Sequence, residues 1–264
     1  MFAKAALLTA LLPGALGLGI LFPAYFCGDK ANCYATDCPQ YDSIVAQVTA
    51  HPTVPIYTII NPASGPMSTA DLYPNYATCI PELKNAGSSS TVLGYVRTNY
   101  GDQPIAQVEA DIDTYASWPA AYRPTGIFFD EGSNDAAHVS QYTSYATYAR
   151  SKGFSFIVYN PGTAANSGYF GSSAADLVVT YESAYSSFST SALTISSSTP
   201  AAKQAVLMYN GPSTAPASII NQLGSLGVGA VFITDDTYSN PNTDNPWDTV
   251  PTIWAAEVAD VAAA

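Results

Sequence analysis

Eight short apolar runs rich in β-branched and aromatic residues recur along the chain, and helix-like segments separate most of them. Several runs are continuously apolar, which is typical of parallel strands that are buried on both faces. Alternation of strand and helix indicates a parallel α/β fold, and eight such units favour a closed (β/α)8 barrel, the TIM-barrel architecture. The predicted strands are Ile20–Tyr25, Val54–Asn61, Thr91–Thr98, Gly126–Glu131, Ser155–Asn160, Asp176–Glu182, Ala205–Asn210 and Ala230–Asp236.

Helical periodicity supports the units between these strands. Apolar residues share one helical face in 105–115 and in 139–149, and weaker patterns mark 43–48, 219–223 and 252–261. The unit between the fifth and sixth strands is short, so we expect its helix to be reduced to a loop or one turn. A doubly wound open sheet is the alternative, but the sequence has no glycine-rich dinucleotide or phosphate loop to support it.

The length of 264 residues fits one such barrel, which typically needs about 250 residues. We expect a signal peptide at 1–17 and a single domain at 18–264. Lys4 supplies the positive start, Ala5–Leu16 is apolar, and Gly17 is the small residue expected before a cleavage site. A membrane anchor is the alternative, but a proline and a glycine interrupt the apolar run. The chain is therefore expected to be secreted, with no membrane contact after cleavage.

The charge balance narrows the choice of ligand. Charged residues make up 11% of the chain, and the formal net charge is −12. An acidic surface repels DNA, RNA and anionic membranes, so no nucleic-acid partner is expected. Such a surface suits a neutral or cationic ligand.

The cysteine pattern points to an oxidising compartment. An even number of cysteines in a secreted chain predicts two disulfides, with three possible connectivities among which the sequence does not choose. The cysteines are Cys27, Cys33, Cys38 and Cys79. Their spacing fits no zinc pattern, and the two histidines are His51 and His138, so we expect no metal and no cofactor.

Polar and aromatic residues gather at the carboxyl ends of the predicted strands. In a barrel these ends meet around one mouth, where the active sites of this fold lie. Aromatic faces can stack on sugar rings and amides can bind hydroxyls, so the set is typical of a carbohydrate site. The candidate substrate-binding residues are Tyr25, Asn61, Tyr95, Arg97, Asn99, Tyr100, Asn160, Tyr181, Tyr209, Asn210, Asp235 and Trp247.

Three carboxylates, Asp130, Glu131 and Glu182, end the fourth and sixth predicted strands. Carboxylates that follow such apolar runs are costly to bury unless they serve a purpose, although Asp130 could instead cap a helix. Glycosidic cleavage needs one carboxyl group as an acid and a second as nucleophile or base. Because adjacent strand residues point in opposite directions, we expect one of Asp130 and Glu131 to face the reacting bond and the other to support it.

The sequence lacks the motifs of serine hydrolases and of zinc proteases. The sequence contains no G-x-S-x-G elbow and no H-E-x-x-H motif. A Ser-His-Asp triad is not expected either, because His51 precedes a strand at the wrong end of the barrel and His138 is predicted to be an exposed helix residue.

Taken together, the motifs resemble the spherulin-4 family, in that family's order and over nearly all of the mature chain. The matching segments are 22–25, 60–66, 94–101, 126–131, 160–162, 181–182, 232–235 and 245–248. The resemblance implies a (β/α)8 barrel of glycoside hydrolase family 135. Characterised members are fungal and cleave galactosaminogalactan, an α-1,4-linked galactosamine polymer, preferring N-acetylated stretches. The resemblance also implies that Asp130 and Glu131 are the family's catalytic pair and that Glu182 is its later catalytic glutamate.

The implied α-linkage suggests a mechanism. In an α-linked 2-acetamido sugar the leaving group and the acetamide lie on the same face, so the acetamide cannot attack from behind. A protein carboxylate should then act as nucleophile and give retention, with the two carboxyl groups about 5–5.5 Å apart. We assign Asp130 as nucleophile, Glu182 as general acid/base and Glu131 as a supporting group, with the roles of Asp130 and Glu131 interchangeable. A gap near about 8 Å would instead indicate inversion.

The sequence departs from the family mainly in its first loop, where Phe26-Cys27-Gly28 begins a cysteine-rich insert that extends to Cys38. This departure concerns the substrate subsites rather than the carboxylates. The sequence therefore predicts a monomeric, endo-acting hydrolase of an amino-sugar polysaccharide that is secreted to the medium or to the cell wall. The alternatives are a non-catalytic wall or spore-coat protein that binds carbohydrate, and a glycosidase of the same fold that cleaves another polysaccharide.

Overall fold

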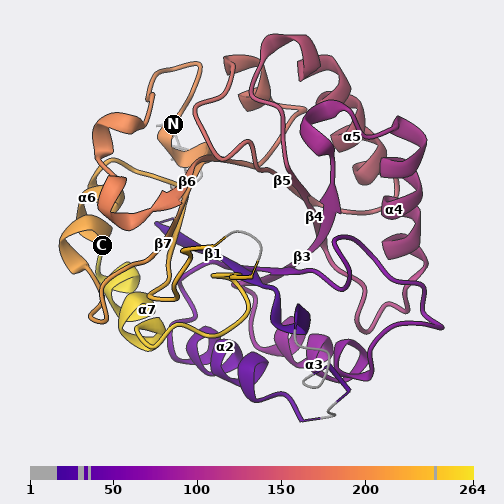
Figure 1. The fold of residues 1–264 in the computed structure, drawn as a ribbon, viewed down its shortest axis with the longest axis horizontal. Helices are drawn as coiled ribbons and strands as arrows, with labels where there is room; N and C mark the ends of the chain where they lie inside the picture. Colours follow the sequence, from indigo (N-terminus) through magenta and orange to yellow (C-terminus); the bar gives the residue numbers. More distant parts are fainter. Residues whose placement is uncertain (1–16, 29–32, 35–36, 241–242) are drawn as a thin grey trace, which may run out of the picture.

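The computed structural model describes residues 17–28, 33–34, 37–240 and 243–264. Apart from Gly17, the predicted signal peptide lies outside the described residues. Eight strands form a closed barrel in which every strand is parallel to its neighbours and the last pairs with the first (Figure 1). The strands are β1 (Gly19–Ala24), β2 (Ile56–Ile60), β3 (Ser90–Arg97), β4 (Gly126–Asp130), β5 (Phe156–Tyr159), β6 (Leu177–Ala184), β7 (Gln204–Tyr209) and β8 (Ala230–Ile233).

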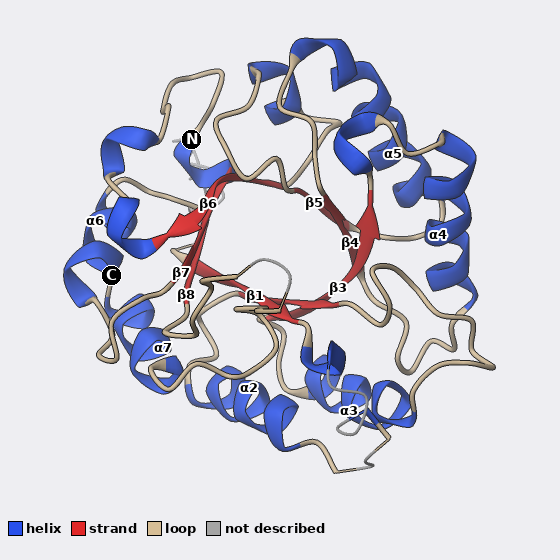
Figure 2. Ribbon diagram, in the orientation of Figure 1, coloured by secondary structure: helices blue, strands red, loops and turns tan. Residues whose placement is uncertain are grey.

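Helices surround the outside of this barrel (Figure 2). The α-helices are α2 (Pro39–Ala50), α3 (Pro74–Asn85), α4 (Ile105–Ser117), α5 (Val139–Ser151), α6 (Ala217–Ser225) and α7 (Trp254–Ala263). Four of the five segments predicted to be helical lie within these helices, and the fifth, 252–261, begins two residues before α7. Helix α3 was not predicted, because Pro81 stands inside it and proline normally interrupts a helix. Its buried residues Tyr76, Ile80 and Leu83 nevertheless have helical spacing.

Two of the eight units are irregular. Between β5 and β6 the connection forms only the 3-10 helix η4 (Ser167–Phe170), as expected. Between β6 and β7 it forms three 3-10 helices, which are η5 (Tyr185–Ser187), η6 (Thr190–Ala192) and η7 (Ala201–Lys203). The prediction of a single-domain (β/α)8 barrel with one or two irregular units is confirmed.

The alternation of side chains along β3 and β4 directs the candidate residues into the barrel. On β4, Phe129 packs against Tyr145 of α5 with ring centroids 5.8 Å apart, so Asp130 takes the opposite, inward direction. On β3, a Cβ atom on Gly94 would lie 2.8 Å from the Tyr115 ring of α4. Gly94 therefore faces outward, and Tyr95 faces inward beside Asp130.

The other end of the barrel is filled by side chains. Tyr57 of β2 and Phe156 of β5 stack with their ring centroids 4.6 Å apart. Because β2 and β5 are not neighbours in the sheet, this contact spans the barrel interior. An interior packed in this way leaves the carboxyl end of the barrel for a ligand, as is usual for this fold.

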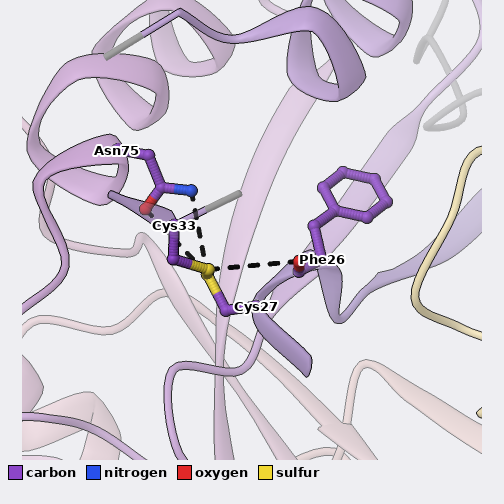
Figure 3. Close-up of a disulfide and its surroundings, with 4 residues drawn as sticks. All are labelled: Phe26, Cys27, Cys33 and Asn75. Carbon is purple, nitrogen blue, oxygen red and sulfur yellow. Dashed lines mark hydrogen bonds between the residues drawn. A yellow bond between two sulfur atoms is a disulfide. The ribbon is translucent and has the colours of Figure 1, made fainter. Parts of the chain in front are cut away.

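The four cysteines form two disulfides, as expected, and the structure gives their connectivity. Cys27 pairs with Cys33, and Cys38 pairs with Cys79. Figure 3 shows the first pair, with the Asn75 amide nitrogen 3.7 Å from Cys27 Sγ. The second joins the start of α2 to the middle of α3. Disulfides are typical of extracellular or other oxidising compartments. No described helix is long and apolar enough to span a membrane.

Candidate active site

A cavity of about 510 Å³ opens at the carboxyl ends of the strands. Its walls come from the ends of β3 to β7 and from the long segment after β8. The lining residues are Tyr100, Asp130, Glu131, Asn160, Pro161, Gly162, Glu182, Tyr209, Tyr238, Asp244, Asn245, Pro246 and Trp247. The three predicted carboxylates therefore share one cavity.

Asp130 and Glu182 meet at the amide of Asn160. Asn160 Nδ2 donates hydrogen bonds to Asp130 Oδ1 at 2.7 Å and to Glu182 Oε2 at 2.6 Å. Since both carboxylate oxygens lie within 2.7 Å of one nitrogen, they can be no farther apart than twice that distance. This arrangement brings together two residues that are 52 positions apart on strands that are not neighbours in the sheet.

An irregularity in β6 accompanies the position of Glu182. The pairing of β6 with β7 shifts register between Val179 and Tyr181, which leaves Thr180 as the extra residue. Thr180 Oγ1 donates to Gln204 Oε1 at 2.8 Å. A bulge of this kind changes the direction of the side chains that follow it. Bulges are common beside active sites for this reason.

The two carboxyl groups differ in their hydrogen-bond donors. Burial raises the pKa of Asp130, but the Tyr95 hydroxyl, the Glu131 backbone N–H and the Asn160 amide all donate to it and oppose the rise. Burial also raises the pKa of Glu182, to about 7, and the nearby charge of Asp130 adds to the effect. Only the Asn160 amide opposes that rise. Asp130 is therefore the better stabilised carboxylate, and Glu182 is the group that keeps its proton more readily.

Glu131 lies at the rim, apart from this pair. Its Oε2 atom accepts a hydrogen bond from Arg97 Nε at 2.8 Å, and both side chains are partly exposed. The Glu131 backbone has a left-handed φ of 49°, and its carbonyl accepts the Tyr100 N–H at 2.5 Å. Both residues of the adjacent pair line the cavity, and which of them faces the reacting bond stays a prediction.

Of the predicted residues at the end of β3, Tyr100 lines the cavity, and Arg97 and Asn99 lie beside it in the chain. Arg97 Nη2 donates to Asn99 Oδ1 at 3.2 Å, so the Arg97 guanidinium contacts both Asn99 and Glu131. Asn99 and Tyr100 both have left-handed backbones, with φ of 46° and 56°. The Tyr100 side chain is 62% exposed, so its ring is available to a ligand in the cavity.

Aromatic side chains form another part of the wall. Tyr209 lies edge-on to Tyr238 at 5.0 Å and to Trp247 at 6.1 Å between ring centroids. Asn210 does not line the cavity, but it holds Tyr238 in place. Asn210 Nδ2 donates to the Tyr238 carbonyl at 3.1 Å, and Asn210 Oδ1 accepts the Tyr238 N–H at 2.6 Å.

Two predicted tyrosines lie next to the carboxylates, outside the cavity lining. Tyr95 is buried and donates to Asp130. Tyr25 packs edge-on against Tyr95 with ring centroids 5.7 Å apart. Burial, followed by the charge of Asp130, raises the pKa of Tyr25, and the charge of Glu182 adds a smaller contribution.

Three predicted substrate-binding residues are engaged elsewhere. Asn61 Oδ1 accepts the N–H of Gly65 in its own loop. Asp235 accepts hydrogen bonds from the backbone and side chain of Thr252. Tyr181 packs against Phe188 and donates to a backbone carbonyl. Position at a strand end was therefore not enough to place these side chains in the cavity.

Other lining residues were not among the predicted site residues. Pro161, Gly162, Asn245 and Pro246 directly adjoin predicted residues within the motifs 160–162 and 245–248, which gave a usable signal. Tyr238 and Asp244 lie in the segment after β8, which has no periodicity. Hydrogen bonds from Ser239, first of all its backbone N–H, hold the pKa of Asp244 well below its usual range.

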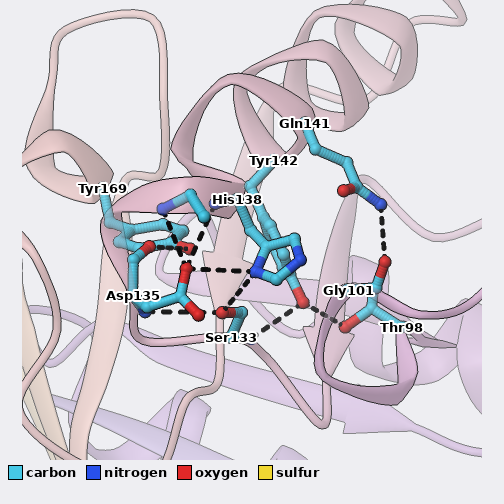
Figure 4. A network of polar contacts seen from close by, with 9 residues as sticks. Thr98, Gly101, Ser133, Asp135, His138, Gln141, Tyr142 and Tyr169 are labelled. Carbon is cyan, nitrogen blue, oxygen red and sulfur yellow. Dashed lines mark hydrogen bonds and ion pairs between the residues drawn. The ribbon is translucent and has the colours of Figure 1, made fainter.

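A polar network beneath the rim includes a Ser-His-Asp combination that is not a catalytic triad (Figure 4). His138 is half-buried at the end of η3 (Ala136–His138), whereas the sequence predicted an exposed helix residue. Its Nδ1 atom contacts both Ser133 Oγ at 3.0 Å and Asp135 Oδ1 at 3.1 Å. A triad requires the serine and the carboxylate on different ring nitrogens. The network instead orders the loop after β4.

The same network supports the backbone at the end of β4. The Tyr142 hydroxyl accepts the Ser133 N–H at 2.9 Å and lies 2.6 Å from Thr98 Oγ1. Thr98 Oγ1 in turn lies 2.7 Å from the Asp130 carbonyl and 3.0 Å from the Glu131 carbonyl. Within the described residues, no group of three His, Cys, Asp or Glu side chains is arranged to hold a metal ion.

Known proteins are similar to this chain in sequence and in architecture. The model of the family described as spherulation-specific family 4 matches residues 19–261. Spherulin-4 of Physarum polycephalum is 35% identical over 192 residues, which cover 69% of this chain and 56% of that protein. The chain thus spans little more than half of that relative's length. The crystal structure of Aspergillus clavatus Sph3 in complex with GalNAc has a TM-score of 0.75 and 25% identity, covering 93% of this chain and 98% of that chain. Because the family model matches all eight strands of the barrel, the chain belongs to the spherulin-4 family.

Proposed function

We propose that this protein is a retaining, endo-acting glycoside hydrolase that cleaves an α-1,4-linked polymer of N-acetylgalactosamine and galactosamine. One observation carries the proposal: Asp130 and Glu182 share the Asn160 amide nitrogen at the bottom of the cavity. The resulting upper limit on their separation is close to the value of about 5–5.5 Å that retaining enzymes use. The wider separation of about 6.5–9.5 Å that inverting enzymes use, which leaves room for a water nucleophile, exceeds this limit.

The different environments of the two carboxyl groups suit different steps. Asp130, with three donors, is the nucleophile: its oxygen bonds to the anomeric carbon as the glycosidic C–O bond breaks. Glu182, with a pKa raised to about 7, gives its proton to the departing oxygen. In the second step, Glu182 takes a proton from water, the hydroxide oxygen bonds to the anomeric carbon, and the Asp130–sugar bond breaks. Glu131, paired with Arg97, supports the end of β4 and contributes to the rim.

Three observations support an amino-sugar substrate. Sph3, which shares the barrel over 93% of this chain, was crystallised in complex with GalNAc. The exposed Tyr100 ring and the Tyr209–Trp247 group offer faces to sugar rings. The net charge of −12 suits a partly deacetylated polymer, whose free amines are cationic.

The test is cleavage of a panel of α- and β-linked hexosamine polymers, with product sizes measured by mass spectrometry and anomeric configuration by NMR. We expect α-anomers to form first, and only from α-linked polymers. Asp130→Asn and Glu182→Gln should each lower the rate by about 10²- to 10⁴-fold. Asp113→Asn alters a surface carboxylate on α4 and should leave the rate unchanged.

The pH profile adds a second readout. Glu182 must be protonated in the first step, so the rate should fall tenfold per unit as the pH rises above about 7. Normal cleavage by both active-site variants would refute the assignment. Sugar binding without release of product from any polymer would favour the non-catalytic wall protein.

We also infer that the protein acts outside the cell, as a monomeric single domain of residues 18–264 that follows a cleaved leader. The two disulfides support this location. Secretion by a fungal host, followed by N-terminal sequencing, should give Leu18 as the first residue. Size-exclusion chromatography with light scattering should give a single protomer mass.

A further inference from the structure

We propose that Asn160 is a positioning residue that holds Asp130 and Glu182 at their working separation through its side-chain amide, rather than a residue that binds sugar. The inference rests on the proposed function, in which these two carboxyl groups carry the chemistry. It assigns Asn160 a different task from the hydroxyl recognition that its place at a strand end suggested.

The hydrogen bonds of the amide leave it no donor for a substrate. A side-chain amide has two N–H bonds, and those of Asn160 are directed to Asp130 Oδ1 and Glu182 Oε2. Its Oδ1 atom accepts the Gly162 N–H at 3.0 Å. This last bond also fixes which end of the amide is nitrogen, because an exchanged amide would place its NH2 group against the Gly162 N–H.

The backbone around Asn160 is held on both sides. Its N–H donates to the Phe129 carbonyl at 2.9 Å, and its carbonyl accepts the Gly132 N–H at 2.7 Å, so it is tied to both sides of the β4 end. The Gly162 carbonyl accepts the Glu182 N–H at 3.0 Å, which ties the same turn to β6. The two strands that carry the carboxyl groups therefore both anchor Asn160.

The turn itself favours this orientation. A side-chain oxygen that accepts the N–H two residues ahead makes an Asx turn, and Pro161 restricts φ between the two positions. Gly162 has φ of 65°, in the left-handed region that glycine tolerates best. A Cβ at this position would lie 3.6 Å from Glu182 Cβ, so the turn passes directly beside the carboxyl group.

Other groups also face the pair and must be considered in any titration. The ring of Tyr25, which follows β1, and Tyr95 of β3 lie close enough to Asp130 for its charge to raise their pKa. Glu131, which directly follows β4, adds its own charge near Asp130. Of these neighbours, Tyr95 and the Glu131 N–H donate to Asp130. For Glu182, the Asn160 amide is the hydrogen bond that opposes the rise in pKa.

Removal of the amide has a directional consequence. Without it, two carboxyl groups face each other with no donor between them, so the pKa of each should rise. In a retaining mechanism the acidic limb of the pH profile reports the nucleophile and the basic limb reports the acid. Both limbs should therefore move to higher pH, by about one unit or more for the loss of a hydrogen bond to a charged group.

The experiment compares Asn160→Leu, which keeps much of the volume without the amide, with Asn160→Ala and a matched control. Asn166→Ala is that control, because Asn166 Oδ1 accepts the Gly168 N–H at 3.0 Å in an equivalent Asx turn. Rates are measured from pH 4 to 9 on the polymer that the wild type cleaves. We expect both Asn160 variants to lower kcat with little change in KM and to shift both limbs upward, while Asn166→Ala keeps the wild-type profile.

A direct titration separates this inference from the proposed function. NMR of protein labelled with ¹³C in glutamate carboxyl groups, with the Glu182 signal identified by its loss in Glu182→Gln, gives the pKa without any substrate. An upward shift in the Asn160 variants supports the positioning role even if no polymer is cleaved. An unchanged Glu182 titration, or a raised KM with unchanged limbs, would overturn it. If Asn160→Leu does not fold by circular dichroism, Asn160→Ala provides the same measurements.

Discussion

Replacement of Glu182 by glutamine should make the protein more stable at pH 8 while it removes activity. Burial raises the pKa of Glu182 from an ordinary 4.5 to about 7. A carboxyl group with a raised folded-state pKa contributes fully to stability below its unfolded pKa, and that contribution is lost as the pH rises through the folded value. Glutamine cannot ionise, and its Oε1 can still accept the Asn160 hydrogen bond.

The magnitude follows from the interval between the two pKa values. Ionisation of Glu182 in the fold should cost the wild type up to about 3 kcal/mol at pH 8, relative to its stability near pH 4.5. For a domain of this size, such a difference corresponds to about 6–12 °C in Tm. Glu182→Gln should match the wild-type Tm near pH 4.5 and exceed it by this amount at pH 8.

Thermal unfolding at the two pH values, followed by circular dichroism, provides the assay. Glu131→Gln is the matched control, because it removes a partly exposed carboxylate whose surface ion pair with Arg97 is worth at most about 1 kcal/mol. It should lower the Tm slightly or not at all. A Glu182→Gln protein that melts at or below the wild-type temperature at pH 8 would refute the argument. So would a difference of the same size at both pH values.

Two further perturbations test what holds the barrel together. Removing the Cys38–Cys79 disulfide by paired alanine substitutions should lower the free energy of unfolding by about 4 kcal/mol, and removing Cys27–Cys33 by about 2 kcal/mol. The first closes the longer loop, since the sequence separations are 41 and 6. Urea unfolding that ranks the two pairs in the opposite order would contradict this. Glu257 is fully buried on α7 and accepts a backbone N–H of β8 at 2.8 Å. Glu257→Leu should therefore lower the free energy of unfolding by about 1–3 kcal/mol more than Glu257→Gln in the same assay. Equal losses of stability in the two variants would exclude that hydrogen bond as the reason.

Much of the fold could be predicted because several strands are continuous runs of apolar residues. Runs such as Leu177–Val179 are fully buried in the closed sheet, and burial on both faces is what made them recognisable. Helix α3 was not predicted, and Pro81, which normally disfavours a helix, stands inside it. Helix propensity describes a residue without tertiary contacts, whereas α3 is held by its buried residues and by the Cys38–Cys79 disulfide to the start of α2.

The site was predictable to the level of strand ends. The apolar runs before Asp130 and Glu182 indicated that both would reach the mouth. The sequence could not show that the Asn160 amide would be used by those carboxylates, because that depends on the turn formed with Gly162. Tyr238 was also missed, because its position depends on two hydrogen bonds with Asn210, 28 residues earlier, one donated by each residue.

Hydrogen bonds at the rim of the cavity join the backbone that follows β3 to the backbone that follows β4. The Tyr100 N–H is bonded to the Glu131 carbonyl, and Thr98 Oγ1 lies within hydrogen-bonding distance of the carbonyls of Asp130 and Glu131. A displacement of the exposed Tyr100 ring that involved its backbone would therefore pull on the peptide that follows Asp130. Contact with a polymer at the outer edge would in this way be transmitted to the carboxylate at the centre. For the proposed polymer substrate, a longer chain that contacts Tyr100 would then change the rate of the chemical step as well as the strength of binding.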